Sequence, residues 1–388
     1  MDVDTAVTEV AAAVGLAEGE SGIRDILAAV VAAEPAAVRE VARLAELPVP
    51  IVAAVCNELR KRGIIDTQRP VRLTAKGREA VAAAGGLVGL RVGCASCHGS
   101  GMVIPAELAG LEEALQRAAD GAPSARAELD QTHCTVATKI GRVLRMHEAR
   151  ALVGQRILLL GDDDLISVAI GQFAAVTGSP AIIRRLAVLD TDADVLAFVG
   201  QQLAGTGVTP ELVQHDLRHR LPEELRGGFD VVLTDPPYTV AGAELFLSRA
   251  VSALAPEPGR HVFFSFGARR PEETLAVQQA IAAMGLAVRS LSPGFNSYVG
   301  AGVLAGTSNL YHLRSTALAR PLIEGSYEGM LYTADGRVTA TRPYRCAACR
   351  AVHEVGPGAR WPQIAALQAA GCPDCGGTVF RPMPLVRR

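Results

Sequence analysis

Residues 156–169 constrain the fold of this chain more than any other stretch. Residues 157–160 form a short apolar run typical of a buried strand, Gly161 follows as a turn, and a helical pattern begins at Leu165. Strand, glycine turn and helix in this order are typical of the first unit of a nucleotide-binding α/β domain. Such turns normally carry further glycines, so that backbone amides can approach an anionic group. Here aspartates occupy positions 162–164 instead.

These aspartates have a structural and a functional explanation. Acidic residues are favoured at helix N-termini, and one of them can serve as the N-cap. That explanation accounts for one or two carboxylates. Asp162, Asp163 and Asp164 in a row, where a ligand normally binds, indicate a site for a cation.

Length and composition narrow the class of protein. A chain of 388 residues predicts two or three domains, and a formal net charge of −2 argues against a strongly nucleic-acid-binding surface. No apolar run approaches the roughly 18 residues of a membrane span, and the N-terminus does not read as a signal peptide. Six of the eight cysteines lie in C-x-x-C pairs, which suits metal binding in a reducing compartment. We therefore expect a soluble cytoplasmic protein.

Four segments are expected. Residues 1–90 form a winged-helix-like domain, and residues 91–134 a linker with a C-x-x-C pair and helices. Residues 135–315 form an α/β catalytic domain with a Rossmann-like, class I methyltransferase-type sheet. Residues 316–388 form a hairpin and a small zinc-ribbon tail.

The winged-helix prediction rests on short helices at 38–44 and 52–62 and a wing strand at 71–74. The second helix of such a pair often reads DNA. Here its first turn has no long polar side chain, and Asn57 with Arg60–Arg62 are the candidate contacts. A dimerisation or substrate-covering role is therefore favoured over DNA binding, and we expect a homodimer.

Two cysteine pairs near the C-terminus predict a metal site. Cys346, Cys349, Cys372 and Cys375 form two C-x-x-C knuckles, the second followed by glycines. Four thiolates close a tetrahedral shell, so the zinc is predicted to be structural. A redox-active pair is the alternative.

A third pair, Cys94 and Cys97, supplies half of a zinc site. The other half could come from a partner chain or from Cys134 with a histidine, or it does not exist.

Further acidic residues follow the next predicted strands. Strand 185–189 ends in Asp190, where Rossmann-like sites bind ribose hydroxyls, whereas Asp192 suits a helix cap better. The third strand ends at Asp216, placed to meet an adenine amino group, and the fourth runs into 235–238. All these positions fall at the carboxyl edge of one parallel sheet, where such sheets bind ligands.

The turn at 235–238 is the most specific of these motifs. In amino-methyltransferases, Asp-Pro-Pro-aromatic holds an amine: the acidic side chain and a proline carbonyl accept its N–H groups, and the ring packs on it. Asp235, Pro236 and Tyr238 fit these roles. Two prolines stiffen the turn, so that the acceptors are positioned in advance.

The charge of the first turn indicates the donor. A sulfonium methyl donor carries an α-carboxylate that three aspartates would repel, by about 4 kcal/mol for one charge pair at about 4 Å. A decarboxylated donor keeps an ammonium, which the same aspartates attract. The acceptor amine must lose a proton, and a carboxylate crowded by other carboxylates is a suitable general base. The residues point to aminopropyl transfer.

The chain resembles the branched-chain polyamine synthase family, the bis(aminopropyl)spermidine synthases, over about residues 20–315. The matching motifs are Gly-Asp-Asp-Asp-Leu at 161–165, Leu-Asp-x-Asp at 189–192, Asp-Leu-Arg at 216–218 and Thr-Asp-Pro-Pro at 234–237. The resemblance implies a winged-helix-like domain before a Rossmann-like one. It also implies aminopropyl transfer from decarboxylated S-adenosylmethionine to the secondary amine of spermidine, without a redox cofactor.

The resemblance also implies roles for single residues. It places the catalytic aspartate at Asp164, with Asp162 and Asp163 as acidic neighbours and Asp235 at the amine. The donor is expected to contact Gly161, Asp190, Asp216 and Leu217. The acceptor is expected to contact Asp130, Gln131, Pro236, Tyr238, Asn296 and Tyr298.

Two other functions fit parts of this pattern. A winged helix, Asp-Pro-Pro-Tyr and a zinc ribbon would suit an S-adenosylmethionine-dependent N-methyltransferase acting on nucleic acid. A catalytically idle regulator could sense polyamines through the aspartates. The triple aspartate disfavours the methyltransferase, because it repels phosphate and carboxylate alike.

Overall fold

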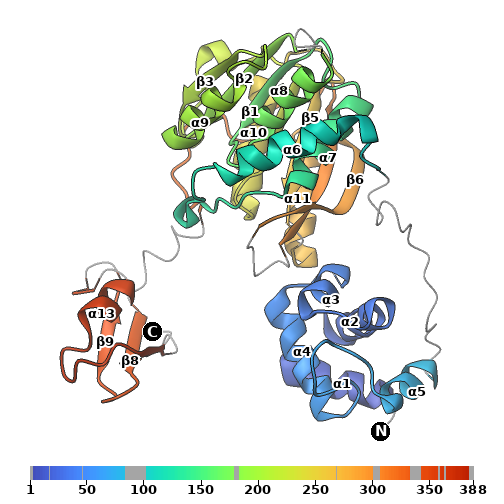
Figure 1. Cartoon of the computed structure of the whole chain (residues 1–388), viewed down its shortest axis with the longest axis vertical. Coiled ribbons are helices and arrows are strands. Elements are labelled where there is room, and N and C mark those ends of the chain that lie inside the picture. Colours follow the sequence, from blue (N-terminus) through green and yellow to red (C-terminus); the bar gives the residue numbers. More distant parts are fainter. Residues whose placement is uncertain are drawn as a thin grey trace. The chain divides into compact units, whose positions relative to one another are not determined.

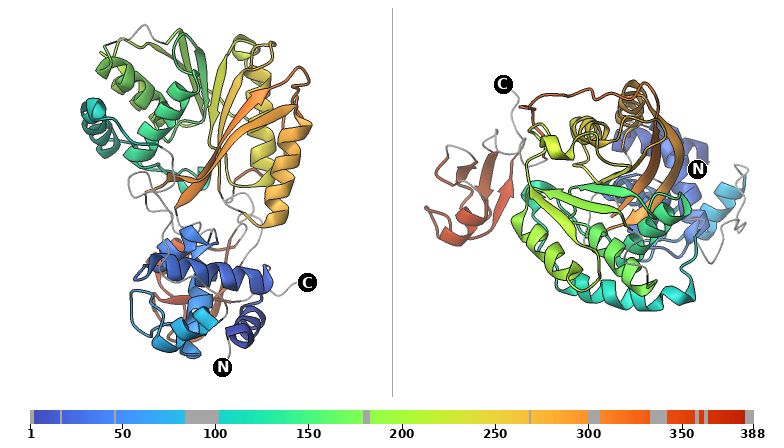
Figure 2. Two further views of the ribbon diagram at one scale, coloured as in Figure 1. Left: turned by 90° about the vertical axis from the view of Figure 1, so that its right-hand side faces the viewer. Right: turned by 90° about the horizontal axis from the view of Figure 1, so that it is seen from above.

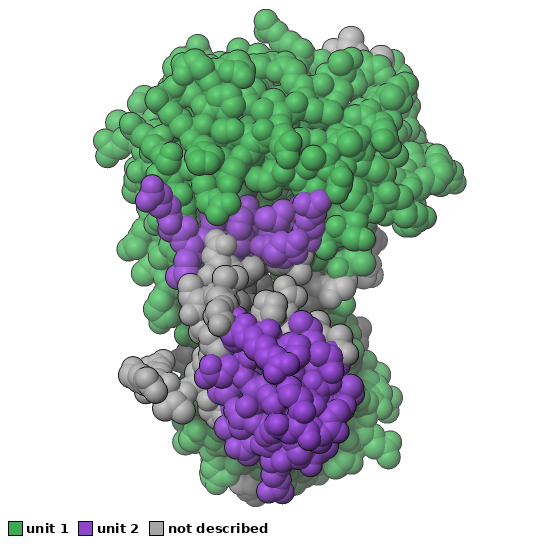
Figure 3. All heavy atoms as spheres, turned by 90° about the vertical axis from the view of Figure 1, so that its left-hand side faces the viewer, with its two compact units in different colours: residues 1–125, 132–327 green, residues 126–131, 328–388 purple. Residues whose placement is uncertain are grey.

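The chain forms two compact units, residues 1–125 with 132–327 and residues 126–131 with 328–388 (Figure 3). This computed structural model describes residues 3–16, 18–45, 47–83, 102–178, 183–267, 269–299, 306–332, 342–356, 359–361 and 364–383. The Cys94–Cys97 pair and the tip of the predicted hairpin, 333–340, lie outside the described residues.

A seven-stranded sheet organises the first unit, in the order β3-β2-β1-β4-β5-β7-β6 (Figure 1). Its strands are β1 (Arg156–Leu160), β2 (Arg185–Asp190), β3 (Pro210–Gln214), β4 (Val231–Thr234), β5 (His261–Phe266), β6 (Leu286–Ser297) and β7 (Thr307–Ser315). Neighbours among β1–β5 pair in parallel, and β7 is antiparallel to both β5 and β6. This is the class I methyltransferase-type sheet that the sequence predicts.

Helices cover both faces of the sheet (Figures 1 and 2). They are α6 (Ala109–Asp120), α7 (Val136–Glu148), α8 (Ile166–Val176), α9 (Ala193–Leu203), α10 (Val240–Ala253) and α11 (Pro271–Ala283). One hydrophobic core joins α6–α9 to the sheet, and α10 packs on β1, β4 and β5 from the other side. All four residues at 157–160 are buried, as expected of a central strand covered on both faces.

The strand boundaries differ slightly from the predictions. The third strand was predicted over 212–215, whereas β3 begins at Pro210 and ends at Gln214; at its exposed edge position the apolar pattern is weak. The fourth strand was predicted over 229–234, whereas β4 begins at Val231; the Asp230 backbone still bonds to Arg156 and His261 on the neighbouring strands, at 2.9 and 3.0 Å.

The N-terminal region of the first unit is helical. It contains α1 (Val3–Val14), α2 (Gly19–Ala33), α3 (Val38–Leu44), α4 (Val49–Lys61) and α5 (Ala75–Ala83), of which α1 was not predicted. Where a wing strand was expected at 71–74, Val71 and Leu73 form isolated antiparallel bridges with Ala36 and Ile65.

The second unit has a small core of its own. β8 (Arg342–Cys346), β9 (Val352–Val355) and β10 (Phe380–Pro382) form an antiparallel sheet in the order β10-β8-β9, accompanied by α13 (Ile364–Ala370). Cys346 and Cys372 lie in its core with Leu367 and Phe380. None of the helices in the described ranges is long and apolar enough to cross a membrane.

Candidate active site

Two turns meet at the carboxyl edge of the sheet because β1 and β4 are neighbours. Leu160 and Thr234 lie opposite each other in the ladder, and the Thr234 hydroxyl donates to the Leu160 carbonyl at 3.0 Å. The residues that follow, 161–164 and 235–238, therefore leave the sheet side by side. The sequence predicted this juxtaposition.

The conformation of the first turn separates its aspartates. Gly161 has φ +76°, and Leu165, which precedes α8, is left-handed at φ +55°. Asp162 is 1% exposed and caps α8: its carboxylate accepts from the Ile166 amide at 2.7 Å and from the Ser167 hydroxyl. The structural explanation therefore holds for Asp162, and burial raises its pKa to about 7.

Asp164 is bound on both carboxylate oxygens. Oδ1 accepts from the Cys134 amide at 2.5 Å, and Oδ2 accepts from Arg142 Nη1 at 2.9 Å. The Lys139 ammonium donates to its backbone carbonyl. Burial alone would raise the pKa of Asp164, but Arg142, Lys139 and hydrogen bonds with Asp235 and Cys134 together lower it. Asp164 is therefore an anchored carboxylate.

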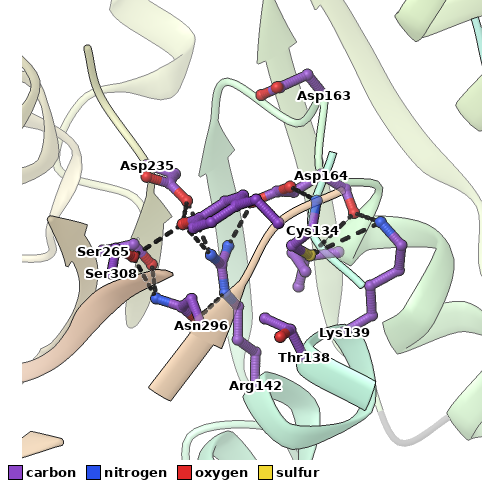
Figure 4. Close-up of polar contacts among 12 residues, drawn as sticks. Cys134, Thr138, Lys139, Arg142, Asp163, Asp164, Asp235, Ser265, Asn296 and Ser308 are labelled. Atoms are coloured by element: carbon purple, nitrogen blue, oxygen red, sulfur yellow. Dashed lines mark hydrogen bonds and ion pairs between the residues drawn. The ribbon is translucent and has the colours of Figure 1, made fainter. Parts of the chain in front are cut away.

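Asp163 has a different environment. Its Oδ2 accepts from the Thr132 amide at 3.1 Å, and its carbonyl is 2.6 Å from His133 Nδ1. Burial raises its pKa well above the usual value, and the charges of Asp164, Asp190 and Asp235 raise it further. In Figure 4 its carboxylate lies apart from the dashed network around Arg142.

Arg142 of α7 joins the two turns. Its guanidinium is 2.9 Å from Asp164 Oδ2 through Nη1 and 2.8 Å from Asp235 Oδ2 through Nη2 (Figure 4). Nε donates to Asn296 Oδ1 at 2.8 Å. Arg142 is 5% exposed, so this bridge is shielded from water. We call Asp163, Asp164 and Asp235 the acidic cluster.

Asp235 also accepts a short hydrogen bond from Tyr298, whose hydroxyl is 2.5 Å from its Oδ2. The pKa of Asp235 is raised to about 6: burial and the charge of Asp164 raise it, and Arg142 and Tyr298 oppose the rise. Tyr238 donates to the Tyr298 hydroxyl at 2.7 Å, and its ring packs against Phe266. A carboxylate flanked by aromatic rings can hold a protonated amine.

Polar side chains of β5, β6 and β7 hold Arg142 and Tyr298 in place. Asn296 is fully buried and donates through Nδ2 to Ser265 Oγ at 3.1 Å and Ser308 Oγ at 2.9 Å. Ser308 is also 2.9 Å from the Tyr298 hydroxyl. Asn296 thus acts from behind the cluster, through Arg142 and Tyr298.

A close backbone approach shapes the second turn. A Cβ at Gly242 of α10 would lie 2.4 Å from the Pro237 carbonyl oxygen, so only glycine fits there. The same carbonyl accepts from the Thr239 amide at 2.7 Å. Pro236 is buried in this turn.

The predicted donor contacts lie at the ends of β2 and β3. Asp190 is 6% exposed and accepts from the amides of Asp162 and Asp192, each at 2.8 Å. Asp192 caps α9 and accepts from Asp194 N at 3.0 Å, as predicted.

Asp216 follows β3 and pairs with Arg218, whose Nη2 is 2.7 Å from Oδ2. Burial would raise its pKa, but Arg218 lowers it, so the carboxylate stays a ready acceptor. The neighbouring Leu217 is buried and its carbonyl accepts from Arg249 Nε at 2.9 Å.

Asp130 and Gln131 belong to the second compact unit. Asp130 has φ +55°, and Gln131 Oε1 accepts from the Arg126 amide at 2.9 Å. Their acceptor-binding role stays a prediction.

The four C-terminal cysteines converge. The ligand atoms of Cys346, Cys349, Cys372 and Cys375 all lie within 4.8 Å of one another, and two S···S distances are 3.6 Å. Tetrahedral Zn–S bonds of about 2.3 Å place sulfurs about 3.8 Å apart, so the donor set fits one zinc ion. His353 Nε2 lies 3.1 Å from Cys372 Sγ, a neighbour that was not predicted.

Arg142 and Lys139 are the site residues that sequence reasoning missed. The sequence predicts a helix here with Ile140, Val143 and Leu144 on one face and assigns no role to its cations, yet both are almost completely buried, Lys139 at 2% exposure. Their spacing of three residues puts them on one side of a helix. Two cations three residues apart, on the helix just before an acidic turn, were the available signal.

Both turns and α7 lie in a region that matches a known protein family. The model for the branched-chain polyamine synthase A C-terminal domain matches residues 111–318, more than half of the chain. The chain belongs to the branched-chain polyamine synthase family.

Relatives of this family cover most of the chain. The N(4)-bis(aminopropyl)spermidine synthase of Thermococcus kodakarensis is 32% identical over 297 residues, which are 74% of this chain and 80% of the relative. An uncharacterized protein of Methanocaldococcus jannaschii is 31% identical over 382 residues, 97% of this chain and 92% of that one.

The fold of this branched-chain polyamine synthase family member also matches a solved structure. The Thermus thermophilus branched-chain polyamine synthase, crystallised with N4-aminopropylspermidine and 5'-methylthioadenosine, superposes with a TM-score of 0.68 at 24% identity. The match covers 85% of this chain and 98% of that one.

Proposed function

We propose that this chain transfers the aminopropyl group of decarboxylated S-adenosylmethionine to the secondary amine of spermidine, giving a branched polyamine. The observation that carries the proposal is the meeting of the Asp-Asp-Asp and Asp-Pro-Pro-Tyr turns at one sheet edge, held by Arg142. Membership of the family, with a relative named N(4)-bis(aminopropyl)spermidine synthase at 32% identity, supports it.

The reaction is a displacement at carbon. The lone pair of the acceptor nitrogen forms a C–N bond to the aminopropyl carbon next to the sulfonium. The C–S bond breaks, its electron pair stays on sulfur, and neutral methylthioadenosine leaves. The acceptor amine is an ammonium at neutral pH, so a carboxylate must first take up one of its two protons to free this lone pair. The tertiary amine that forms keeps the other proton.

The acidic cluster supports a decarboxylated donor. The first turn and Asp190 bring carboxylates to the sheet edge, against the cations Arg142 and Lys139. An α-carboxylate on the donor would be repelled here, whereas an ammonium is attracted. The same repulsion disfavours a nucleic-acid N-methyltransferase, although such enzymes can share this sheet.

The geometry favours Asp163 over Asp164 as the general base. Asp164 has both oxygens bound and a lowered pKa, whereas the pKa of Asp163 is raised. When two acids have pKa values pushed apart, the one with the raised value is suited to take up a proton. Asp164 and Asp235 then serve as fixed charges for the cationic substrates.

The remaining contacts divide between the two substrates. Asp190 and Asp216, with Gly161 and Leu217, follow the strands that end on the nucleoside side of Rossmann-like sites, and we assign them to the donor. Asp235, Pro236, Tyr238 and Tyr298 are assigned to the acceptor amine.

The other parts of the chain have proposed roles outside the chemistry. We assign the N-terminal helices to a winged-helix-like domain that contributes to dimerisation or covers the substrate. The four cysteines hold one structural zinc, which supports the small sheet of the C-terminal unit. The homodimer stays a prediction.

Product analysis tests the proposed function. The full-length protein is incubated with spermidine and either decarboxylated S-adenosylmethionine or S-adenosylmethionine, and the products are weighed by mass spectrometry. The expected result is addition of aminopropyl units to spermidine with the first donor. Methylation with the second donor and no aminopropyl addition would overturn the proposal.

A further inference from the structure

We propose that Arg142 is a positioning residue: by tying Asp164 and Asp235 to one guanidinium, it makes Asp163 the carboxylate that takes up the acceptor's proton. This inference rests on the proposed aminopropyl transfer. It assigns a function to a residue of α7, which precedes the sheet and contributes none of the sequence motifs.

The guanidinium is committed to this bridge. Arg142 donates through Nη1 to Asp164, through Nη2 to Asp235 and to the Tyr298 hydroxyl at 3.0 Å, and through Nε to Asn296. A planar fork can serve two carboxylates at fixed spacing, whereas a lysine ammonium is a single point charge. Arg142 therefore sets both the charge and the separation of the two acids.

Two close carboxylates cannot both stay ionised in a buried site without a cation. Arg142 supplies that cation permanently, because a guanidinium does not lose its proton in proteins. The side chains of Asp164 and Asp235 are 5% and 14% exposed, so water cannot replace it. Arg142 thus favours the ionised form of both carboxylates, and it opposes the burial that raises the pKa of Asp235 to about 6.

Other groups facing the pair share this role only in part. Lys139, on the same helix, also lowers the pKa of Asp164 through its charge, but it donates to the Asp164 backbone carbonyl and lies 3.7 Å from Cys134 Sγ. Tyr298, which follows β6, is a neutral donor, and burial and the Asp235 charge raise its pKa well above the usual value. The same causes raise the pKa of the Tyr238 hydroxyl in the second turn.

Asp163 is left outside the bridge. Among the described residues, the hydrogen bond found on its carboxylate comes from the Thr132 amide, and no cation lies within ion-pair distance of it. It feels the negative charges of Asp164, Asp235 and Asp190. The bridge therefore gives Asp164 a cationic partner and leaves Asp163, the adjacent residue of the same turn, without one among the described residues.

A double-mutant cycle on kcat tests this role in the full-length enzyme, with spermidine and saturating decarboxylated S-adenosylmethionine. In the wild-type background, Asp163→Asn should lower kcat by about 100-fold or more, the loss expected of a general base. In the Arg142→Gln background, Asp164 and Asp235 are free to accept the proton. There, Asp163→Asn should cost less than about 10-fold.

Control variants separate positioning from folding. Arg249 is as deeply buried, at 1% exposure, but donates to the backbone carbonyls of Leu217, Ile323 and Gly325. In the Arg249→Lys background, Asp163→Asn should still lower kcat by about 100-fold or more, as in the wild type. Arg142→Lys keeps a cation and guards against misfolding of Arg142→Gln; it should give an intermediate coupling. If Asp163→Asn lowers kcat by the same factor in both Arg142 backgrounds as in the wild type, the inference is wrong.

A second measurement needs no turnover. Carboxyl carbons of ¹³C-labelled aspartate are titrated by NMR in wild type and both Arg142 variants, with assignments from the Asp164→Asn and Asp235→Asn proteins. The variants should show a proton shared by Asp164 and Asp235 at a higher pH than in the wild type, by at least about one unit. If Asp164 and Asp235 titrate at the same pH in the wild type and in the Arg142 variants, the inference is wrong. If their titration shifts but the enzyme makes no aminopropyl products, only the proposed function is wrong.

Discussion

Asp164 and Asp235, which follow neighbouring parallel strands, each accept a hydrogen bond from the same buried guanidinium, at 2.9 and 2.8 Å. Asp163, adjacent to Asp164, lies outside this bridge. A turn of three like residues thus provides three environments: a helix cap at Asp162, a carboxyl group with a raised pKa at Asp163 and an anchored carboxylate at Asp164.

The acidic cluster should select the donor by charge. We expect decarboxylated S-adenosylmethionine to bind at least about 100-fold more tightly than S-adenosylmethionine, since one charge pair at about 4 Å contributes about 4 kcal/mol before screening. Isothermal calorimetry with both donors measures the difference. Equal or reversed affinities would contradict aminopropyl transfer.

The two aspartates of the turn should differ in their response to pH. Asp163→Asn should lose about 100- to 10,000-fold in kcat at neutral pH. It should partly recover at high pH, where the acceptor amine is already deprotonated. Asp164→Asn should be impaired without this recovery, because it lacks a fixed charge and leaves Arg142 underpaired. Rates across pH with saturating donor compare them; recovery of Asp164→Asn alone would return the base to Asp164.

Binding of the acceptor amine should weaken at low pH. The pKa of Asp235 is raised to about 6, so below that pH its carboxyl becomes neutral and attracts a cationic amine less. In a plot of log kcat/KM for the acceptor against pH, the slope should therefore increase by about one unit below about pH 6. Asp235→Asn should remove this extra slope while keeping an acceptor oxygen. A wild-type profile without the change in slope would show that Asp235 does not titrate there.

The second turn should not tolerate a side chain at Gly242. A Cβ there meets the Pro237 carbonyl oxygen at 2.4 Å, so Gly242→Ala must displace the turn. We expect kcat/KM for the acceptor to fall at least about 10-fold while the Kd for the donor changes little. Gly110→Ala in α6 is the matched control, because no atom lies within 4 Å of its added Cβ. It should be neutral or stabilising by up to about 1 kcal/mol.

The C-terminal cysteines should hold one zinc ion. Elemental analysis of the full-length protein should find one equivalent bound by Cys346, Cys349, Cys372 and Cys375, lost in the double variant Cys346→Ser, Cys375→Ser. Donor affinity should be retained, since these residues form a compact unit without the acidic cluster. A full-length protein without zinc would contradict the assignment.

Sequence by itself determined the strands and the residues that follow them. Apolar runs such as 157–160 and the acids that end them are local signals, and parallel strands bring their carboxyl ends to one edge. The cysteine spacing likewise predicted the four sulfurs that converge. The family motifs lie in these same turns, so the function could be inferred before the fold.

Only the tertiary structure decided the surroundings of each carboxylate. Asp162, Asp163 and Asp164 are chemically identical, and only the left-handed Leu165 and the packing of α8 direct one into the helix and two toward the site. Arg142 and Lys139 reach the cluster because α7 packs against α8 at the sheet edge, a contact between segments that no local pattern encodes. Proton affinity in a buried site depends on such neighbours and on burial, so it is a property of the folded arrangement.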